Sequence, residues 1–153
     1  MLDDVVAAAE AIGVAYVARG RGGQGAAVGA ELARLPDRAV LVVNADLPCV
    51  TPRDLLTLLG SVPDGGIALV EAADGTTNVI ALSSPTQFAP LYGTGSAERF
   101  RNHAQRLGVP CTTVAIPNLV DDVDTLDDLF RLESRVGPRT AAALSTVPAA
   151  ASA

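Results

Sequence analysis

The sequence contains no lysine, and all 11 of its basic residues are arginine. Schiff-base chemistry on a lysine and a lysine clamp on a phosphate group are therefore excluded for the 153 residues of this chain. The net charge is -6 at pH 7, and the arginines are scattered along the sequence. A basic face of the kind that binds nucleic acid is therefore not expected.

Cysteine and aromatic residues are also scarce. The two cysteines, Cys49 and Cys111, are too few for a disulfide framework or a zinc site. Aromatic residues make up 3% of the chain, so its core must be built from aliphatic side chains. No apolar run approaches the length of a membrane span, and the first residues lack the positive region of a signal peptide. These absences predict a cytoplasmic protein with reduced cysteines and no association with membranes.

Strand and helix patterns alternate over residues 1–144, which predicts a single α/β domain with three α/β/α layers and a mostly parallel sheet. The expected strands are residues 14–18, 39–43, 67–71, 78–82 and 111–116; the expected helices are residues 2–12, 24–35, 97–107, 125–135 and one that starts at Thr51. The Asp74-Gly75 pair is a turn signal that can add antiparallel strands. Residues 145–153 are too poor in large apolar side chains to pack and are expected to be frayed.

The central expected strand, residues 39–43, is an unbroken apolar run rich in valine, as in a parallel strand buried on both faces. Asp46 follows just past its C-terminal end, where open α/β sheets bind their ligands. Thr51, Pro52 and Asp54 then form the start of a helix with a capping box. The alternative interpretation is that Asp46 only solvates a turn.

A second group of carboxylates, Asp121, Asp122 and Asp124, precedes the last expected helix. Thr125 and Asp128 form a capping box there, so one aspartate could serve only the helix N-terminus. Three carboxylates within four residues exceed that need. Together with Asp46 they would suit a magnesium ion, which binds one or two carboxylates and offsets phosphate charge in a nucleotidyl transfer.

Two glycine-containing loops complete the expected rim of the sheet. Residues 19–25 form a Gly-rich run that leads into a helix and lets a ligand approach the backbone, although a plain flexible loop has the same composition. Residues 93–96, Gly-Thr-Gly-Ser, precede another helix and offer amides and the Ser96 hydroxyl to a phosphate or carboxylate. The alternative is that Ser96 only caps the helix.

The order of several short motifs resembles a known family, the 2-phospho-L-lactate (or phosphoenolpyruvate) guanylyltransferases, over roughly residues 13–144. The motifs are Asn-Ala-Asp-Leu-Pro at 44–48, Asp-Gly-Thr-Thr-Asn at 74–78, Tyr-Gly-Thr-Gly-Ser at 92–96, Asp-Val-Asp-Thr at 122–125 and Val-Gly-Pro-Arg-Thr at 136–140. The resemblance implies the Rossmann-like nucleotide-diphospho-sugar transferase fold. It also implies a role in the biosynthesis of the deazaflavin coenzyme F(420).

What the resemblance implies for the chemistry is the joining of GMP from GTP to a phosphorylated three-carbon acid, with release of pyrophosphate. The implied catalytic and Mg²⁺-binding residues are Asp46 with Asp122 or Asp124. The implied acid-binding residues are Thr77, Asn78, Gly93, Gly95 and Ser96, and the implied nucleotide-binding residues are Gly23, Gln24, Gly25 and Ala26.

Two features depart from the family pattern. The family's chain opens with a strand and a Lys/Arg-bearing loop that grips the triphosphate, followed by a helix and a second strand. This sequence begins at what resembles the next helix, so that first strand and nucleotide loop are expected to be missing. The sheet edge exposed in this way would suit a homodimer. In addition, Gln24-Gly-Ala-Ala27 lacks the asparagine of the family's Gly-Leu-Asn-Ala-Ala segment.

Two other functions remain open at this point. The same fold could transfer a nucleotide to a sugar phosphate or to molybdopterin, although the segments at 74–78 and 93–96 favour a phosphorylated acid. A degenerate, non-catalytic domain that binds a ligand or partner is the other alternative, and the missing triphosphate loop supports it.

Overall fold

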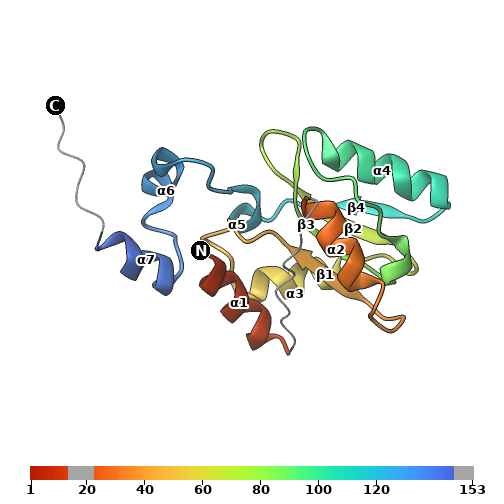
Figure 1. Ribbon diagram of the computed structural model, residues 1–153, viewed down its shortest axis with the longest axis horizontal. Coiled ribbons are helices and arrows are strands. Elements are labelled where there is room, and N and C mark those ends of the chain that lie inside the picture. The colour runs from red at the N-terminus through yellow and green to blue at the C-terminus, as the bar shows by residue number, and fades with distance from the viewer. Residues whose placement is uncertain (14–22, 147–153) are drawn as a thin grey trace.

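The computed structural model describes residues 1–13 and 23–146, so the expected strand 14–18 and the first part of the Gly-rich loop lie outside the described residues. In chain order the elements are α1 (Leu2–Ala11), α2 (Gln24–Leu32), β1 (Val40–Val43), α3 (Pro52–Gly60), β2 (Ile67–Glu71), β3 (Thr77–Leu82), the 3₁₀ helix η1 (Pro85–Gln87), α4 (Ser96–Leu107), β4 (Cys111–Thr113), α5 (Pro117–Val120), α6 (Leu126–Leu132) and α7 (Pro138–Leu144). Figure 1 shows that α6 and α7 stand apart from the sheet, beyond α5. Within the described ranges, no helix combines the length and apolar character needed to cross a membrane.

The protein is an α/β structure, but its described sheet is mixed, and the prediction of a mostly parallel sheet is wrong in this respect. The strand order is β1-β3-β2-β4, with β3 antiparallel to β1 and β2, and β2 parallel to β4. The cause is the turn at Asp74 and Gly75. Gly75 adopts a φ of 81°, and Asp74 Oδ1 accepts a hydrogen bond from Thr76 N at 2.9 Å. This tight turn reverses the chain and lays β3 directly beside β2.

The two faces of the sheet bury alternate residues of β2 and β3, as the two-residue period of a strand requires. Ala68, Val70, Val79 and Ala81 pack in one apolar cluster with residues of α1, α3 and α5. Ile67, Leu69, Ile80 and Leu82 pack in a second cluster with residues of α2 and α4. Both central strands are therefore covered on both faces, which explains their continuous apolar sequences.

Two helix starts confirm the predicted capping boxes. At α3, Asp54 N donates to Thr51 Oγ1 at 3.3 Å, and Thr51 N donates to Asp54 Oδ2 at 2.9 Å. Thr125 and Asp128 make the same reciprocal pair at the start of α6. The short elements η1, α5 and α7 were not predicted, because so few residues provide too little periodicity to identify a helix.

The first and last helices are joined by the buried carboxylate of Asp4. It accepts hydrogen bonds from the Thr140 amide at 2.8 Å, the Thr140 hydroxyl at 2.6 Å and the Arg139 amide at 3.1 Å. A Cβ on Gly137 would lie 2.5 Å from Asp4 Cγ, so only glycine permits this approach. Burial acts to raise the pKa of Asp4, but the hydrogen bonds from Thr140 and Arg139 outweigh it and leave the pKa lowered.

We expect Asp4→Asn to lower the free energy of unfolding at pH 7 by about 1–3 kcal/mol, because an amide cannot accept all the bonds that the carboxylate accepts. A carboxylate whose pKa is lower in the folded state stabilises the fold above its unfolded pKa, about 3.9. That contribution is lost as the pH falls through the folded pKa. Urea unfolding of the wild type and Asp4→Asn between pH 3 and pH 7 should therefore show that the difference between their free energies of unfolding becomes smaller in acid. A difference in free energy of unfolding that stays constant down to pH 3 would contradict this account.

Candidate active site

Asp46 lies in the turn that follows β1, as the sequence predicts. Its side chain is half-buried, and its Oδ1 atom is fully shielded from solvent without a hydrogen-bond partner among the described residues. Burial raises the pKa of Asp46, and the nearby charge of Asp124 raises it further. A carboxylate oxygen that is buried and unpaired loses its hydration without compensation, which is unfavourable unless a cation or a donor binds there.

The loop that carries Asp122 and Asp124 lies against Asp46, because Val123 N donates a hydrogen bond of 3.1 Å to the Asp46 carbonyl oxygen. The pKa of Asp122 is raised, first by burial and then by the charges of Asp46, Asp124 and Asp74. Residues from two distant segments are thus brought together, as predicted. Asp74, at the β2–β3 turn, adds a carboxylate that the sequence interpretation did not include in the site.

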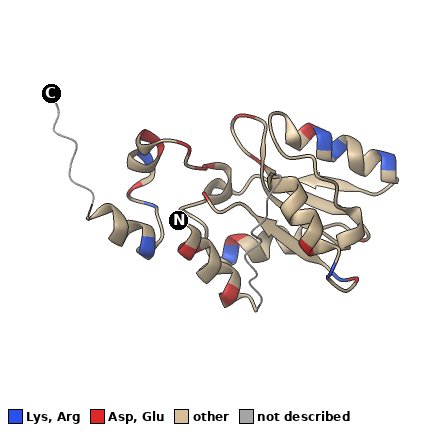
Figure 2. Cartoon of the chain, viewed as in Figure 1, with Lys and Arg blue, Asp and Glu red and all other residues tan. Residues whose placement is uncertain are grey.

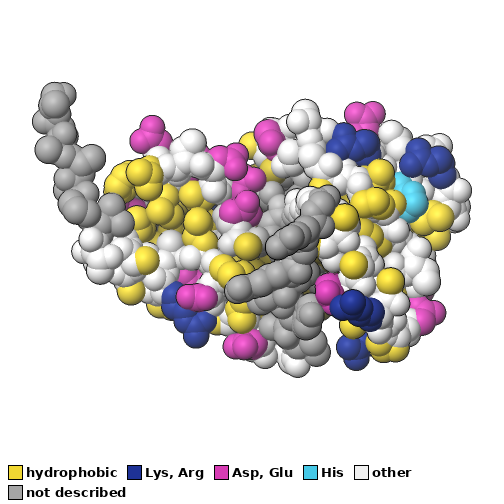
Figure 3. Space-filling view, in the orientation of Figure 1, with side chains coloured by type: hydrophobic (Ala, Val, Ile, Leu, Met, Phe, Trp, Pro, Cys, Tyr) yellow, Lys and Arg dark blue, Asp and Glu magenta, His cyan; other side chains and the backbone are white. Residues whose placement is uncertain are grey.

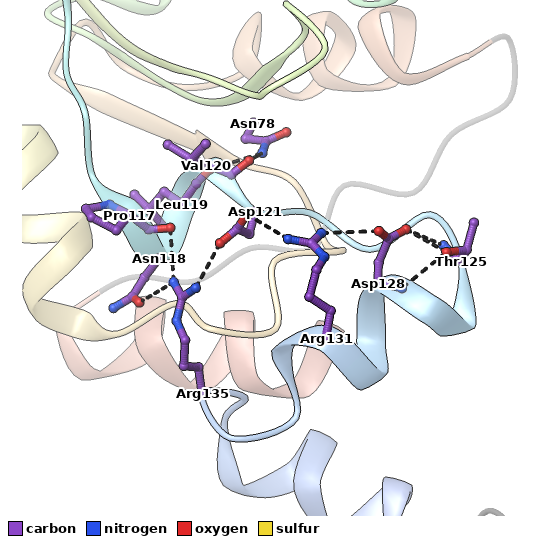
Figure 4. A network of polar contacts seen from close by, with 10 residues as sticks. All are labelled: Asn78, Pro117, Asn118, Leu119, Val120, Asp121, Thr125, Asp128, Arg131 and Arg135. Atoms are coloured by element: carbon purple, nitrogen blue, oxygen red, sulfur yellow. Dashed lines mark hydrogen bonds and ion pairs between the residues drawn. The ribbon is translucent and has the colours of Figure 1, made fainter.

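Asp121, by contrast, takes part in a separate network (Figure 4). Its carboxylate accepts from Arg135 at 2.9 Å and from Arg131 at 3.4 Å. Arg135 also donates to the Pro117 carbonyl at 3.2 Å and to Asn118 Oδ1 at 3.1 Å. Asp121 therefore fixes the loop to α6, whereas the charges of Asp122 and Asp124 act on one another and on Asp46.

The acidic residues fit a magnesium ion better than a metal that needs a full set of protein ligands. Among residues 1–13 and 23–146, no three His, Cys, Asp or Glu side chains converge closely enough to hold a metal. Magnesium needs only one or two carboxylates and completes its shell with water and substrate phosphates. Asp46, with its unpaired Oδ1, and Asp122, whose pKa the charge of Asp46 raises, are carboxylates of the kind and number that magnesium requires. Acidic side chains mark the segment between α5 and α6, and they gather at the middle of the molecular face (Figures 2 and 3).

Asn44 connects the segments that are expected to bind the nucleotide and the acid, and the sequence interpretation did not include it in the site. Its Oδ1 accepts from Gln24 Nε2 at 2.6 Å, and its Nδ2 donates to the Thr77 carbonyl at 3.2 Å. Its backbone N donates to the Asn78 carbonyl at 3.0 Å. A polar residue directly after an apolar strand, two positions before Asp46, is the signal that could have identified it.

Thr77, Asn78 and Ser96 are all buried, with exposed fractions of 1%, 1% and 0%. Ser96 Oγ donates to Thr77 Oγ1 at 3.2 Å, which brings these two expected acid-binding residues together. Ser96 is the first residue of α4, its N-cap is Gly95, and no side-chain cap bond forms there. The interpretation of Ser96 as a simple helix cap is therefore wrong.

Gly93 and Gly95 adopt left-handed conformations, with φ values of 106° and 67°, in the loop before α4. The Arg99 side chain holds this loop by donating to the carbonyl oxygens of Leu91, Tyr92 and Thr94. Arg99 was also missed by the sequence interpretation. Its position near the start of a helix, where the helix dipole disfavours a cation, could have been the signal.

The expected nucleotide segment lines a pocket of about 440 Å³ together with the loop before α4. Gly23, Gln24, Gly25 and Ala26 contribute one side, and the other side is formed by Pro90, Tyr92 and Gly93. A Cβ on Gly25 would lie 2.8 Å from Pro90 Cβ, so glycine is required for this close approach. The pocket therefore joins the expected nucleotide-binding segment to Gly93, one of the expected acid-binding residues.

Buried polar atoms without partners are concentrated at this site. In the described part of the chain they are Asp46 Oδ1, Asn78 Oδ1 and the Tyr92 hydroxyl. Burial raises the pKa of Tyr92, so its hydroxyl stays protonated. Buried polar groups are nearly always hydrogen-bonded in folded proteins, and exceptions mark strained or functional positions. Asp46 and Asn78 are expected site residues, and Tyr92 directly precedes the expected acid-binding loop of residues 93–96.

The chain is similar to several proteins named phosphoenolpyruvate guanylyltransferase. The phosphoenolpyruvate guanylyltransferase of Geodermatophilus obscurus is 39% identical over 108 residues, which are 70% of this chain and 48% of that protein. The enzyme of that name from Streptomyces scabiei is 36% identical over 110 residues, 71% of this chain and 50% of that protein. The one from Sphaerobacter thermophilus is 36% identical over 94 residues, 61% of this chain and 45% of that protein.

These similarities confirm the resemblance that the motifs indicate. The chain spans about half the length of the curated relatives it matches. No family model matches the chain.

We expect Asp46→Asn to raise the melting temperature at pH 7. A carboxyl group whose folded pKa lies above its unfolded value destabilises the fold once the pH exceeds that unfolded value, about 3.9. An uncharged amide removes this effect. The increase in melting temperature over the wild type should therefore disappear in acid, where Asp46 is protonated. Thermal unfolding at pH 7 and pH 3.5 would measure it. The control is Asp127→Asn, the same change of charge at an exposed residue of α6. An equal rise in the control would refute the explanation.

Proposed function

We propose that this chain forms the nucleotidyl-transfer site of a phosphoenolpyruvate guanylyltransferase. The reaction would join GMP from GTP to phosphoenolpyruvate or 2-phospho-L-lactate, release pyrophosphate and contribute to the biosynthesis of coenzyme F(420). The similarity to guanylyltransferases supports a transferase of this class. The observation that carries the proposal is the buried, unpaired Oδ1 of Asp46, which lies at a strand end and close to the charges of Asp122 and Asp124.

The proposed chemistry is a direct displacement at phosphorus. An oxygen of the acid's phosphate attacks the α-phosphorus of GTP, and the bond from that phosphorus to the oxygen bridging to the β-phosphorus breaks. The electron pair of that bond leaves with pyrophosphate, and no covalent intermediate with the protein forms. Catalysis then consists of positioning the two substrates and neutralising their charges.

Each part of the site has a role in this proposal. Asp46 with Asp122 or Asp124 would hold magnesium, which when bound supplies positive charge to the phosphate groups. The buried Thr77–Ser96 pair and the loop of Gly93 and Gly95 would bind the acid. The pocket lined by residues 23–26 would receive the nucleotide. Since magnesium is a hard cation with oxygen ligands, these carboxylates suit it better than a soft metal.

The first test is pyrophosphate release by the purified chain with Mg²⁺, one nucleotide and one acceptor. We expect release with GTP and either phosphoenolpyruvate or phospholactate, and little with ATP. Glucose 1-phosphate and molybdopterin are the acceptors that test the alternative substrates of this fold. A folded protein that releases no pyrophosphate with any pair of nucleotide and acceptor would favour a non-catalytic ligand-binding domain.

We further expect Asp46→Asn to reduce the rate of pyrophosphate release by about 100-fold or more, because a charge-stabilising group at the reacting phosphates is lost. Asp127→Asn makes the same change of charge at an exposed position of α6 and serves as the control. Retention of the wild-type rate by Asp46→Asn would exclude Asp46 from the metal site.

A further inference from the structure

The side chain of Asn78 connects the sheet to the loop that carries the acidic residues. It extends from β3 and is 1% exposed. Its Nδ2 group donates two hydrogen bonds of 3.1 Å, one to the Leu119 carbonyl and one to the Val120 carbonyl (Figure 4). These residues end α5, whose last carbonyl oxygens have no partner within so short a helix. Asn78 therefore satisfies the end of α5 from a strand more than forty residues away.

The acidic loop is held on both sides of Asp122. Before it, Asn78 binds the carbonyls of residues 119 and 120. After it, Val123 N binds the Asp46 carbonyl. The bonds of Arg131 and Arg135 direct Asp121 towards α6 and away from this group. With both flanks fixed, the backbone that carries Asp122 has a defined position relative to Asp46.

The same bonds leave Asn78 poorly suited to bind an anion. Both N–H groups of its amide are used by backbone carbonyls, and its remaining polar atom, Oδ1, is an acceptor. The phosphate and carboxylate of a phosphorylated acid are also acceptors, so Oδ1 would repel them. Rotating the amide by 180° would place Oδ1 against two carbonyl oxygens, which fixes the observed orientation.

We propose that Asn78 is a positioning residue for the metal-binding carboxylates and not a ligand of the acid. This inference rests on the proposed function, because it assigns Asp46 and Asp122 to a divalent cation. Asn78 acts through the backbone of α5 and the loop after it, and it sets the distance between the two carboxylates. Groups that orient metal ligands from outside the coordination shell typically change metal affinity by about 10–100-fold when they are removed.

The test measures the binding of Mn²⁺ to the full chain in the absence of substrates, with electron paramagnetic resonance as the readout. We expect Asn78→Ala to weaken Mn²⁺ binding by about tenfold or more. Asn78→Ser, which keeps a single donor, should fall between Asn78→Ala and the wild type and also covers the case in which Asn78→Ala does not fold. The matched control is Thr77→Val on the same strand, which removes the contact with Ser96. It should change Mn²⁺ affinity by less than about twofold.

Steady-state kinetics separate the possible roles of Asn78. A positioning role predicts a higher Mg²⁺ requirement with an unchanged KM for phosphoenolpyruvate. A higher KM with unchanged Mn²⁺ affinity would make Asn78 a ligand of the acid and overturn the inference. Unchanged metal binding in folded variants, or a wild-type chain that binds no Mn²⁺, would also overturn it. A wild-type chain that binds Mn²⁺ but transfers no GMP would refute the proposed function alone, because the Mn²⁺ comparison does not depend on turnover.

Discussion

The site depends on the pairing of β1 with β3 at the point where β1 ends. There the Asn44 backbone N–H donates to the Asn78 carbonyl, one residue beyond the last strand pair, Val43 with Val79. This bond places the turn with Asp46 beside the strand that carries Thr77 and Asn78. Since β3 runs antiparallel to β1, the start of β3 and the end of β1 meet at the same edge of the sheet. A polar cluster can form there from residues more than thirty positions apart.

Carboxylates at this edge are held together against their mutual repulsion. Burial and neighbouring negative charges raise the pKa values of both Asp46 and Asp122. The surrounding contacts, chiefly the backbone bond between Val123 and Asp46, maintain an arrangement that the isolated side chains would avoid. Strain of this kind is typical of functional sites, where the energy is recovered when a ligand binds. Asp121 shows the contrast, because its charge is balanced by two arginines and its role is structural.

The features that could be predicted from the sequence are those set by local chemistry. Asp46 after a valine-rich strand, the capping boxes at Thr51 and Thr125, and the turn at Asp74 all depend on neighbours within a few residues. The contacts of Asn44 and Arg99 could not be predicted, because they depend on which distant carbonyl lies nearby after folding. The placement of β3 is intermediate: the turn signal indicated antiparallel strands, but the position of β3 between β1 and β2 could not be read from it.

The contact between Asp4 and Thr140 joins residues 136 positions apart, so the folded chain forms a closed ring without a covalent bond. Closing so long a loop costs conformational entropy, which the buried hydrogen bonds of Asp4 must offset. Beside it, Gly137 N donates to the Pro48 carbonyl at 2.7 Å, two residues after Asp46. The contact between α1 and α7 is thus linked by a hydrogen bond to the turn that carries Asp46. Unfolding of α7 at its N-terminus would therefore remove the hydrogen bond that anchors the chain two residues after Asp46.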